Sequence, residues 1–154
     1  MSRDKIDHPV TTSSPEETQA IGRRLSAFLA AGDVVCLWGD LGAGKTCLVQ
    51  GICRGLEVRE SVVSPSFTLI NEYSGKYPVA HIDFYRLKGE VDLEQLGFDD
   101  LLDGKRIVLI EWPERAAGAL PADRVDIHLR WISDNQREIK LITYLNKITQ
   151  LIDK

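Results

Sequence analysis

The stretch LWGDLGAGKTCLVQG, residues 37–51, decides the fold of this chain. Its residues 39–46 match the pattern G-x-x-x-x-G-K-[ST], in which glycines precede a lysine and a hydroxyl residue. The preceding run, DVVCLW (33–38), has the continuous apolar pattern of a strand buried on both faces. The segment from Lys45 to Arg54 shows apolar residues at helical spacing. A glycine loop between a buried strand and an amphipathic helix predicts a phosphate-binding loop.

Each residue of this loop has a predicted role at a nucleoside triphosphate. The glycines let several backbone N–H groups turn inward around an anion, and the following helix adds the positive end of its dipole. Lys45 is expected to reach the β- and γ-phosphates, and the Thr46 hydroxyl to complete the coordination of Mg²⁺. The loop motif alone does not separate ATP from GTP, but no guanine-reading motif is evident, which favours ATP; the predicted cofactors are ATP and Mg²⁺. The predicted phosphate contacts are Asp40, Leu41, Gly42, Ala43, Gly44, Lys45 and Thr46.

A phosphate-binding loop of this kind also needs a carboxylate at the end of a neighbouring strand. Glu111 follows four apolar residues in IVLIE, the pattern of a central strand, and is the favoured group beside Mg²⁺. Asp83, which ends VAHID, is expected to orient the attacking water or the water shell of the metal. The predicted metal-binding set is therefore Thr46, Glu111 and Asp83, and the predicted catalytic set is Lys45, Asp83 and Glu111. His81 could act as a base, but packing is the favoured interpretation.

The remaining segments predict strands that alternate with helices. SSPEETQAIGRRLSAFLAAG (13–32) is typical of a helix with Ser14 as N-cap and Gly32 at its end, and VDLEQLGFDDLLDG (91–104) of a second helix. Two β-rich stretches, around Ser74-Gly75 and Asp134-Asn135, predict antiparallel hairpins, and residues 145–152 a short helix. The expected fold is α/β: a P-loop NTPase-like sandwich with a mixed, mainly parallel sheet, antiparallel hairpins and helices on both faces. We expect one domain over residues 1–154, with residues 1–13 loosely ordered.

Composition narrows the classes of function. The chain has 154 residues and a net charge of −4, so it has no general attraction to nucleic acid or to an anionic membrane. RNA contact would need a partner or a local basic patch, for which Arg137, Lys140 and Lys147 are candidates, although solvated surface charges are the favoured interpretation.

The three cysteines form no CxxC pair, which argues against zinc and disulfides. No signal peptide or membrane span is evident, so the expected compartment is the cytoplasm.

Four motifs in this order resemble the bacterial tRNA threonylcarbamoyladenosine biosynthesis ATPase family, TsaE. They are GDLGAGKT (39–46), SPSFTL (64–69), HIDFYRL (81–87) and EWPE (111–114). The resemblance implies an ATPase that works with the partner proteins TsaD and TsaB and meets tRNA only indirectly, through that complex. It implies that TsaD and TsaB together form the transferase that modifies the tRNA, and that ATP hydrolysis resets this transferase between turnovers.

The same resemblance implies roles for residues outside the glycine loop. Ser64 and Thr68 would lie in a switch-like segment that faces the γ-phosphate, and Trp112 beside the nucleotide or the partner surface. Ser14 and Asn135 would lie near the purine. Ser66 and Phe67 stand where family members often carry Thr and Tyr, which would weaken the switch if the missing phenol oxygen made a necessary bond.

Two other functions remain compatible with the sequence. A small-molecule kinase would also use the glycine loop, but it needs arginines or a lid to clamp the transferred phosphoryl group, and only YRLKG (85–89) offers them. A nucleotide-gated binding module would use ATP only to order the switch segment. Product analysis separates the first from an ATPase, and variants that bind but do not split ATP separate the second.

Overall fold

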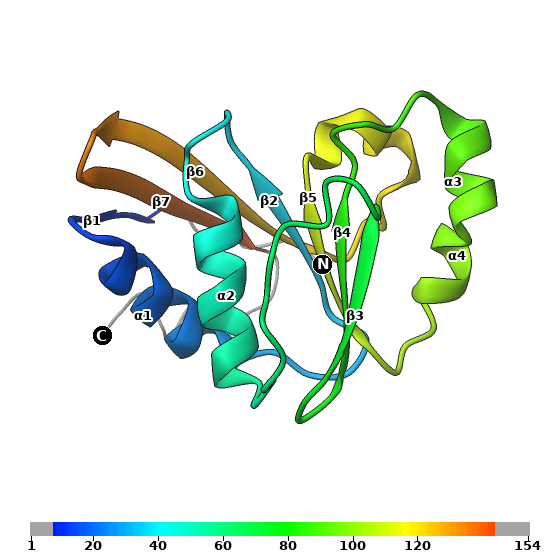
Figure 1. Cartoon of the computed structure of the whole chain (residues 1–154), viewed down its shortest axis with the longest axis horizontal. Helices are drawn as coiled ribbons and strands as arrows, with labels where there is room; N and C mark the ends of the chain where they lie inside the picture. Colours follow the sequence, from blue (N-terminus) through cyan, green and yellow to red (C-terminus); the bar gives the residue numbers. More distant parts are fainter. Residues whose placement is uncertain (1–7, 144–154) are drawn as a thin grey trace, which may run out of the picture.

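A computed structural model describes residues 8–143 of the chain, which form a seven-stranded sheet with helices packed on it (Figure 1). The strand order is β1-β7-β6-β2-β5-β4-β3. The strands are β1 (His8–Thr12), β2 (Val34–Trp38), β3 (Ile70–Ser74), β4 (Pro78–Asp83), β5 (Ile107–Glu111), β6 (Val125–Ser133) and β7 (Gln136–Thr143).

The centre of the sheet is parallel and its two sides are antiparallel. Strand β2 pairs with β5 and with β6, and β4 pairs with β5, all in parallel. The hairpins β3–β4 and β6–β7 add antiparallel strands, and β1 closes one edge against β7. All five residues of β5 are buried, as its continuous apolar pattern predicts for a central parallel strand. The predicted mixed sheet and both hairpins are therefore confirmed.

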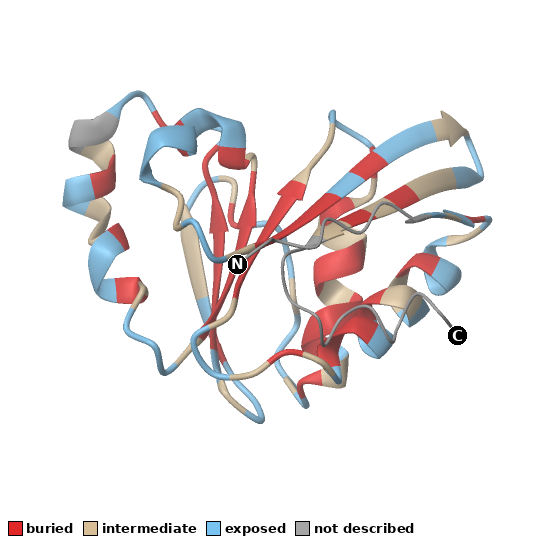
Figure 2. Ribbon diagram, turned by 180° about the vertical axis from the view of Figure 1, so that it is seen from behind, coloured by how far each residue is buried: buried red, intermediate tan, exposed pale blue. Residues whose placement is uncertain are grey.

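Helices cover both faces of the sheet. On one face, α1 (Pro15–Ser26) and α2 (Lys45–Gly55) pack against each other and against the side chains of β2 and β5 that include Val35, Leu37 and Leu109. On the other face, α3 (Glu90–Leu96), α4 (Phe98–Leu101) and the 3₁₀ segment η1 (Pro113–Ala119) enclose a second apolar cluster. Figure 2 shows the buried residues concentrated in the central strands and on the inner sides of the helices.

The ends of several elements differ from the sequence predictions. The helix predicted over 91–104 is split at Gly97, whose φ of 73° lies in the left-handed region and stops the helical path. The first helix ends at Ser26, because residues 27–32 turn toward the sheet and the Gly32 N–H donates to the Arg106 carbonyl at 3.0 Å. Residues 8–12, expected to be loosely ordered, form β1 because β7 supplies its hydrogen-bond partners. The helix predicted over 145–152 lies outside the described residues.

The start of α1 follows its capping signals. The Ser14 hydroxyl accepts from the Glu17 N–H at 3.1 Å, and Pro15 occupies the first turn. The Glu17 carboxylate in turn accepts from the Ser13 N–H at 2.7 Å, one residue before the N-cap. Within residues 8–143, no helix is long and apolar enough to cross a bilayer.

Candidate nucleotide-binding site

The glycine loop joins the end of β2 to the start of α2 at the centre of the sheet. Gly42 and Gly44 have φ values of 83° and 103°, a region that residues with a Cβ atom rarely adopt. A Cβ at Gly39 would lie 2.5 Å from the Leu129 carbonyl oxygen, so the loop packs directly on β6. The free N–H groups of the first turn of α2, which begins at Lys45, face the loop. This backbone geometry suits an anion.

A cleft of about 580 Å³ opens beside this loop. It brings together segments from four places in the chain, because the carboxyl ends of β2, β4 and β5 meet at one edge of the sheet. Most of the residues predicted for the site line this cleft: Leu41, Gly42, Ala43, Gly44, Lys45, Thr46, Ser64, Asp83, Glu111 and Trp112.

Lys45 is buried and bends back over the loop that precedes it. Its ammonium donates to the carbonyl oxygens of Gly39 and Asp40, the latter at 3.3 Å, and lies 3.6 Å from the centroid of the Trp112 ring. Burial lowers the pKa of Lys45 below its usual value, and the negative charge of Glu111 opposes that shift. A desolvated cation beside a glycine loop is suited to an anionic ligand, because the ligand compensates a charge that water cannot reach.

Thr46 and Glu111 meet at the floor of the cleft. The Thr46 hydroxyl lies 3.0 and 3.1 Å from the two carboxylate oxygens of Glu111, although the residues are 65 positions apart. Glu111 is 3% exposed and also contacts His81 Nε2 at 2.6 Å. A hydroxyl and a carboxylate are hard oxygen ligands, so this pair fits Mg²⁺, which binds through one or two protein oxygens together with phosphates and water.

Asp83 lies next to Glu111, since the two are register partners in the parallel pair β4–β5. It is 2% exposed, and its Oδ2 accepts from the hydroxyls of Ser64 and Ser66 at 3.2 and 3.4 Å. Its Oδ1 accepts from the Tyr85 N–H at 2.8 Å. Asp83 therefore fastens the segment around SPSFTL to the edge of the cleft.

Four other predicted residues lie outside this cleft: Asp40, which lines the wider groove described below, and Thr68, Ser14 and Asn135. Thr68 is exposed, and its hydroxyl donates to Asn71 Oδ1 at 3.1 Å, because the chain turns at Leu69 (φ 70°) before entering β3. Ser14 and Asn135 line a separate cavity of about 310 Å³ together with Gly44 and Cys47. The segment before α1 and the β6–β7 hairpin therefore meet beside the loop, and the position of the purine stays a prediction.

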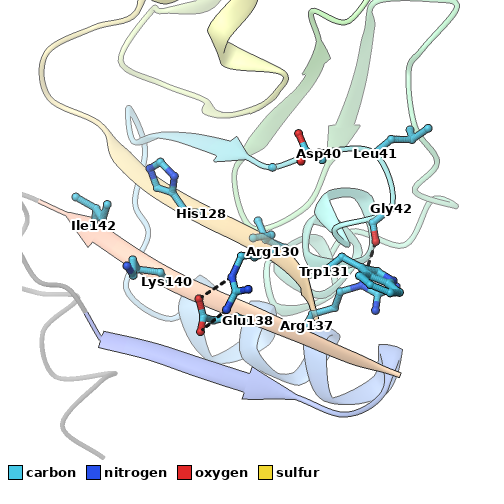
Figure 3. Close-up of a pocket in the computed structure, with 12 residues that line it drawn as sticks. Asp40, Leu41, Gly42, His128, Arg130, Trp131, Arg137, Glu138, Lys140 and Ile142 are labelled. Atoms are coloured by element: carbon cyan, nitrogen blue, oxygen red, sulfur yellow. Dashed lines mark hydrogen bonds and ion pairs between the residues drawn. The ribbon is translucent and has the colours of Figure 1, made fainter. Parts of the chain in front are cut away.

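A wider groove of about 850 Å³ borders the same loop and is lined by Asp40, Trp131 and the outer residues of β6 and β7 (Figure 3). Arg137 donates from Nε to the Gly42 carbonyl at 3.0 Å, and Arg130 pairs with Glu138 at 3.3 Å. Of the three residues considered for a basic RNA patch, Arg137 and Lys140 line this groove, and Lys147 lies outside the described residues. The bonds of Arg137 to backbone carbonyls give it a structural task.

The sequence did not assign several residues that the cleft contains. Ser66 contacts Asp83, and Phe67, Tyr85 and Arg86 line the cleft; the motifs SPSFTL and HIDFYRL that hold them were the available signal. Arg137 carried no such signal, because its partner Gly42 is 95 residues away and an alternating hairpin does not reveal its contacts.

The three thiols should differ sharply in reactivity. Burial raises the pKa of Cys36 and Cys53 to about 12, so almost no thiolate forms at pH 8. Cys47 is half-buried, and burial raises its pKa as well. We expect Ellman's reagent at pH 8 to label Cys47 alone, slowly, and ATP to slow it further because Cys47 lines the cavity with Ser14 and Asn135. C47S should show no labelling until it is unfolded, and rapid labelling of all three native thiols would contradict this prediction.

Comparisons with known proteins agree on one family. The family model described as threonylcarbamoyl adenosine biosynthesis protein TsaE matches residues 12–139. The tRNA threonylcarbamoyladenosine biosynthesis protein TsaE of Bacillus subtilis (strain 168) is 40% identical over 144 residues, which cover 93% of this chain and 90% of that protein. The protein of the same name from Treponema pallidum (strain Nichols) is 40% identical over 126 residues, covering 82% and 93%. The crystal structure of Bacillus subtilis YdiB aligns with a TM-score of 0.81 at 35% identity, covering 99% of this chain and 95% of the other.

Proposed function

The chain belongs to the threonylcarbamoyl adenosine biosynthesis protein TsaE family, and we propose that it is the subunit that binds and hydrolyses ATP in tRNA threonylcarbamoyladenosine biosynthesis. The observation that carries this proposal is the convergence of Lys45, Thr46, Asp83 and Glu111 on one cleft beside a glycine loop. Each of these residues is of the type that holds or cleaves a nucleoside triphosphate.

The residues of the cleft divide the work of phosphoryl transfer. Backbone N–H groups of the loop and of the first turn of α2 would donate to the phosphate oxygens, and Lys45 would exchange its carbonyl contacts in the loop for the β- and γ-phosphates. Thr46 and Glu111 would hold Mg²⁺, which when bound neutralises charge on the phosphate oxygens. Asp83, next to Glu111, orients the attacking water.

The segment around SPSFTL is the element that would report the state of the nucleotide. Ser64 and Ser66 hold it to Asp83 through hydroxyl contacts of 3.2 and 3.4 Å, which are few and easily exchanged. A γ-phosphate in the cleft offers competing acceptors to the same hydroxyls, and its loss removes them. Phe67, 83% exposed, lies on this segment, so its movement would change the surface that a partner meets.

We propose TsaD and TsaB as these partners, with tRNA met only through them and with the reaction in the cytoplasm.

Two rival functions use the same cleft. A small-molecule kinase would need cations at the transferred phosphoryl group; Arg86 lines the cleft, but its guanidinium lies 4.2 Å from the centroid of the Phe67 ring. A gated binding module would need no ordered water, whereas the proposed hydrolysis assigns that task to Asp83.

The test is ATP hydrolysis measured with and without the purified TsaD and TsaB proteins. We expect slow release of free phosphate from the chain alone and faster release with the pair present. Phosphate transfer to a metabolite would favour the kinase. A rate of phosphate release that does not change when TsaD and TsaB are added would contradict the proposed partners. Full tRNA modification by a variant that binds ATP without splitting it would favour the gated module.

A further inference from the structure

His81, on β4, lies fully buried behind the carboxylate of Glu111. Strand alternation puts it on the same face of the sheet as Asp83, and its register partner on β5 is Leu109, two residues before Glu111. His81 Nε2 lies 2.6 Å from Glu111 Oε2. The imidazole therefore touches the carboxylate from inside the protein while Thr46 touches it from the side of the cleft.

The other nitrogen of the ring determines which tautomer is present. Within the described part of the chain, Nδ1 of His81 is a buried atom with no hydrogen-bond partner. A hydrogen on Nδ1 would be a buried donor without an acceptor, which costs more than an unpaired lone pair on that atom. The short contact at Nε2 also needs a hydrogen between ring and carboxylate. The hydrogen thus sits on Nε2 and is donated to Glu111.

This donor restricts the orientation of Glu111. A glutamate side chain has three rotatable bonds, and in an open cleft its carboxylate could turn toward water or toward Lys45. With Oε2 held by His81, both oxygens remain within 3.1 Å of the Thr46 hydroxyl. A protein group that hydrogen-bonds to a metal-ligating side chain, and so fixes its orientation, usually contributes strongly to metal affinity.

We propose that His81 is a positioning residue whose Nε2–H holds the Glu111 carboxylate beside the Thr46 hydroxyl, so that the two present their oxygens together to a Mg²⁺–nucleotide. The inference rests on the proposed function and goes beyond it, because it gives a positioning task to a residue whose sequence context favours packing. Packing needs the volume of the ring, whereas positioning needs a hydrogen-bond donor at one point in space.

The test compares side chains that keep or lose this donor. In H81Q the amide nitrogen replaces Nε2, in H81N the amide is too short to reach Glu111, and H81L keeps volume without a donor. Y73F is the matched control, because the Tyr73 ring packs 6.4 Å from His81 while its hydroxyl contacts the Val63 carbonyl at 3.5 Å, away from Glu111. For each variant, the affinity for a fluorescent ATP analogue is measured in EDTA and in Mg²⁺, alongside thermal unfolding.

We expect H81L and H81N to lose about 10–100-fold of the gain in affinity that Mg²⁺ gives the wild type, with affinity in EDTA unchanged. H81Q should retain most of the gain, and Y73F all of it. Equal Mg²⁺ gains in the wild type, H81L and H81N would overturn the positioning role while leaving the proposed function intact. A wild type that binds no ATP would remove the proposed function itself, and this inference with it. If H81L fails to fold, the contrast between H81Q and H81N decides the question.

Discussion

Lys45→Ala is expected to lower ATP hydrolysis by about 10²–10³-fold, the usual loss when one preorganised charged donor is removed from a site of this kind. Lys45 is the cation that the glycine loop holds at the cleft, 5% exposed and in contact with the Gly39 and Asp40 carbonyls. A nucleotide offers this ammonium far stronger acceptors than two neutral carbonyl oxygens. Binding of an ATP analogue, followed by fluorescence, should weaken together with the rate of phosphate release.

Thermal unfolding provides the necessary control for this substitution. Because burial lowers the pKa of Lys45, the folded protein disfavours the charged form of this side chain. The resulting loss of stability is absent above the pKa of the unfolded state and grows as the pH falls toward the pKa of the folded state. At neutral pH K45A removes this cost but also the carbonyl and ring contacts of the ammonium, so it should unfold at a temperature close to that of the wild type. K76A removes a lysine from the exposed β3–β4 turn and should retain full activity. Normal ATP affinity and rate in K45A would remove the nucleotide assignment.

Glu111→Gln is expected to raise the Mg²⁺ concentration needed for half-maximal hydrolysis by at least 10–100-fold and to lower the maximal rate. The substitution keeps the shape of a buried side chain but removes its negative charge. It also presents an N–H₂ group to Thr46 or His81, both of which donate to the carboxylate in the wild type. Affinity for the nucleotide in EDTA should be retained. A Mg²⁺ titration of steady-state hydrolysis measures both changes.

Asp83→Asn is the matched comparison, because Asp83 is the neighbouring buried carboxylate of the same cleft. If Asp83 orients the attacking water, D83N should lower the maximal rate with a smaller effect on the Mg²⁺ requirement than E111Q shows. The reverse ranking would exchange the two roles. Unchanged Mg²⁺ dependence in both variants would contradict a metal site formed with Thr46.

The parts of the fold that the sequence predicts well are those determined by local pattern. The glycine loop, the buried strands around Leu37 and Leu109, and both hairpins follow from short-range periodicity and turn residues, and the family resemblance is confirmed by the comparisons. The break at Gly97 was missed because an apolar stripe continues across it, and the φ of 73° depends on how α4 packs. Strand β1 was missed because a polar N-terminal edge strand is ordered only by its partner, β7.

In the candidate site, too, features that follow from local motifs could be predicted, and features that depend on tertiary contacts could not. That Lys45, Thr46 and Glu111 meet in one cleft could be predicted from motif chemistry, since each follows or ends a recognisable strand. The contact between His81 and Glu111 could not be foreseen, because it depends on the register of two strands whose side chains meet across 30 residues of sequence. Thr68 was predicted on the switch segment, but the turn at Leu69 directs it to Asn71.

The order of the strands also dictates when this protein can acquire its ligand during synthesis. The strand that precedes the glycine loop, β2, is flanked only by β5 and β6, which begin at Ile107 and Val125, and β1 at the opposite end of the chain pairs only with β7. A ribosome-bound chain that has emerged as far as α2 has the loop but neither flanking strand nor Glu111. Such distant pairings slow folding and leave apolar strands uncovered in the meantime. If the proposed nucleotide binds through Glu111, it can stabilise only a chain that has been synthesised at least through β5.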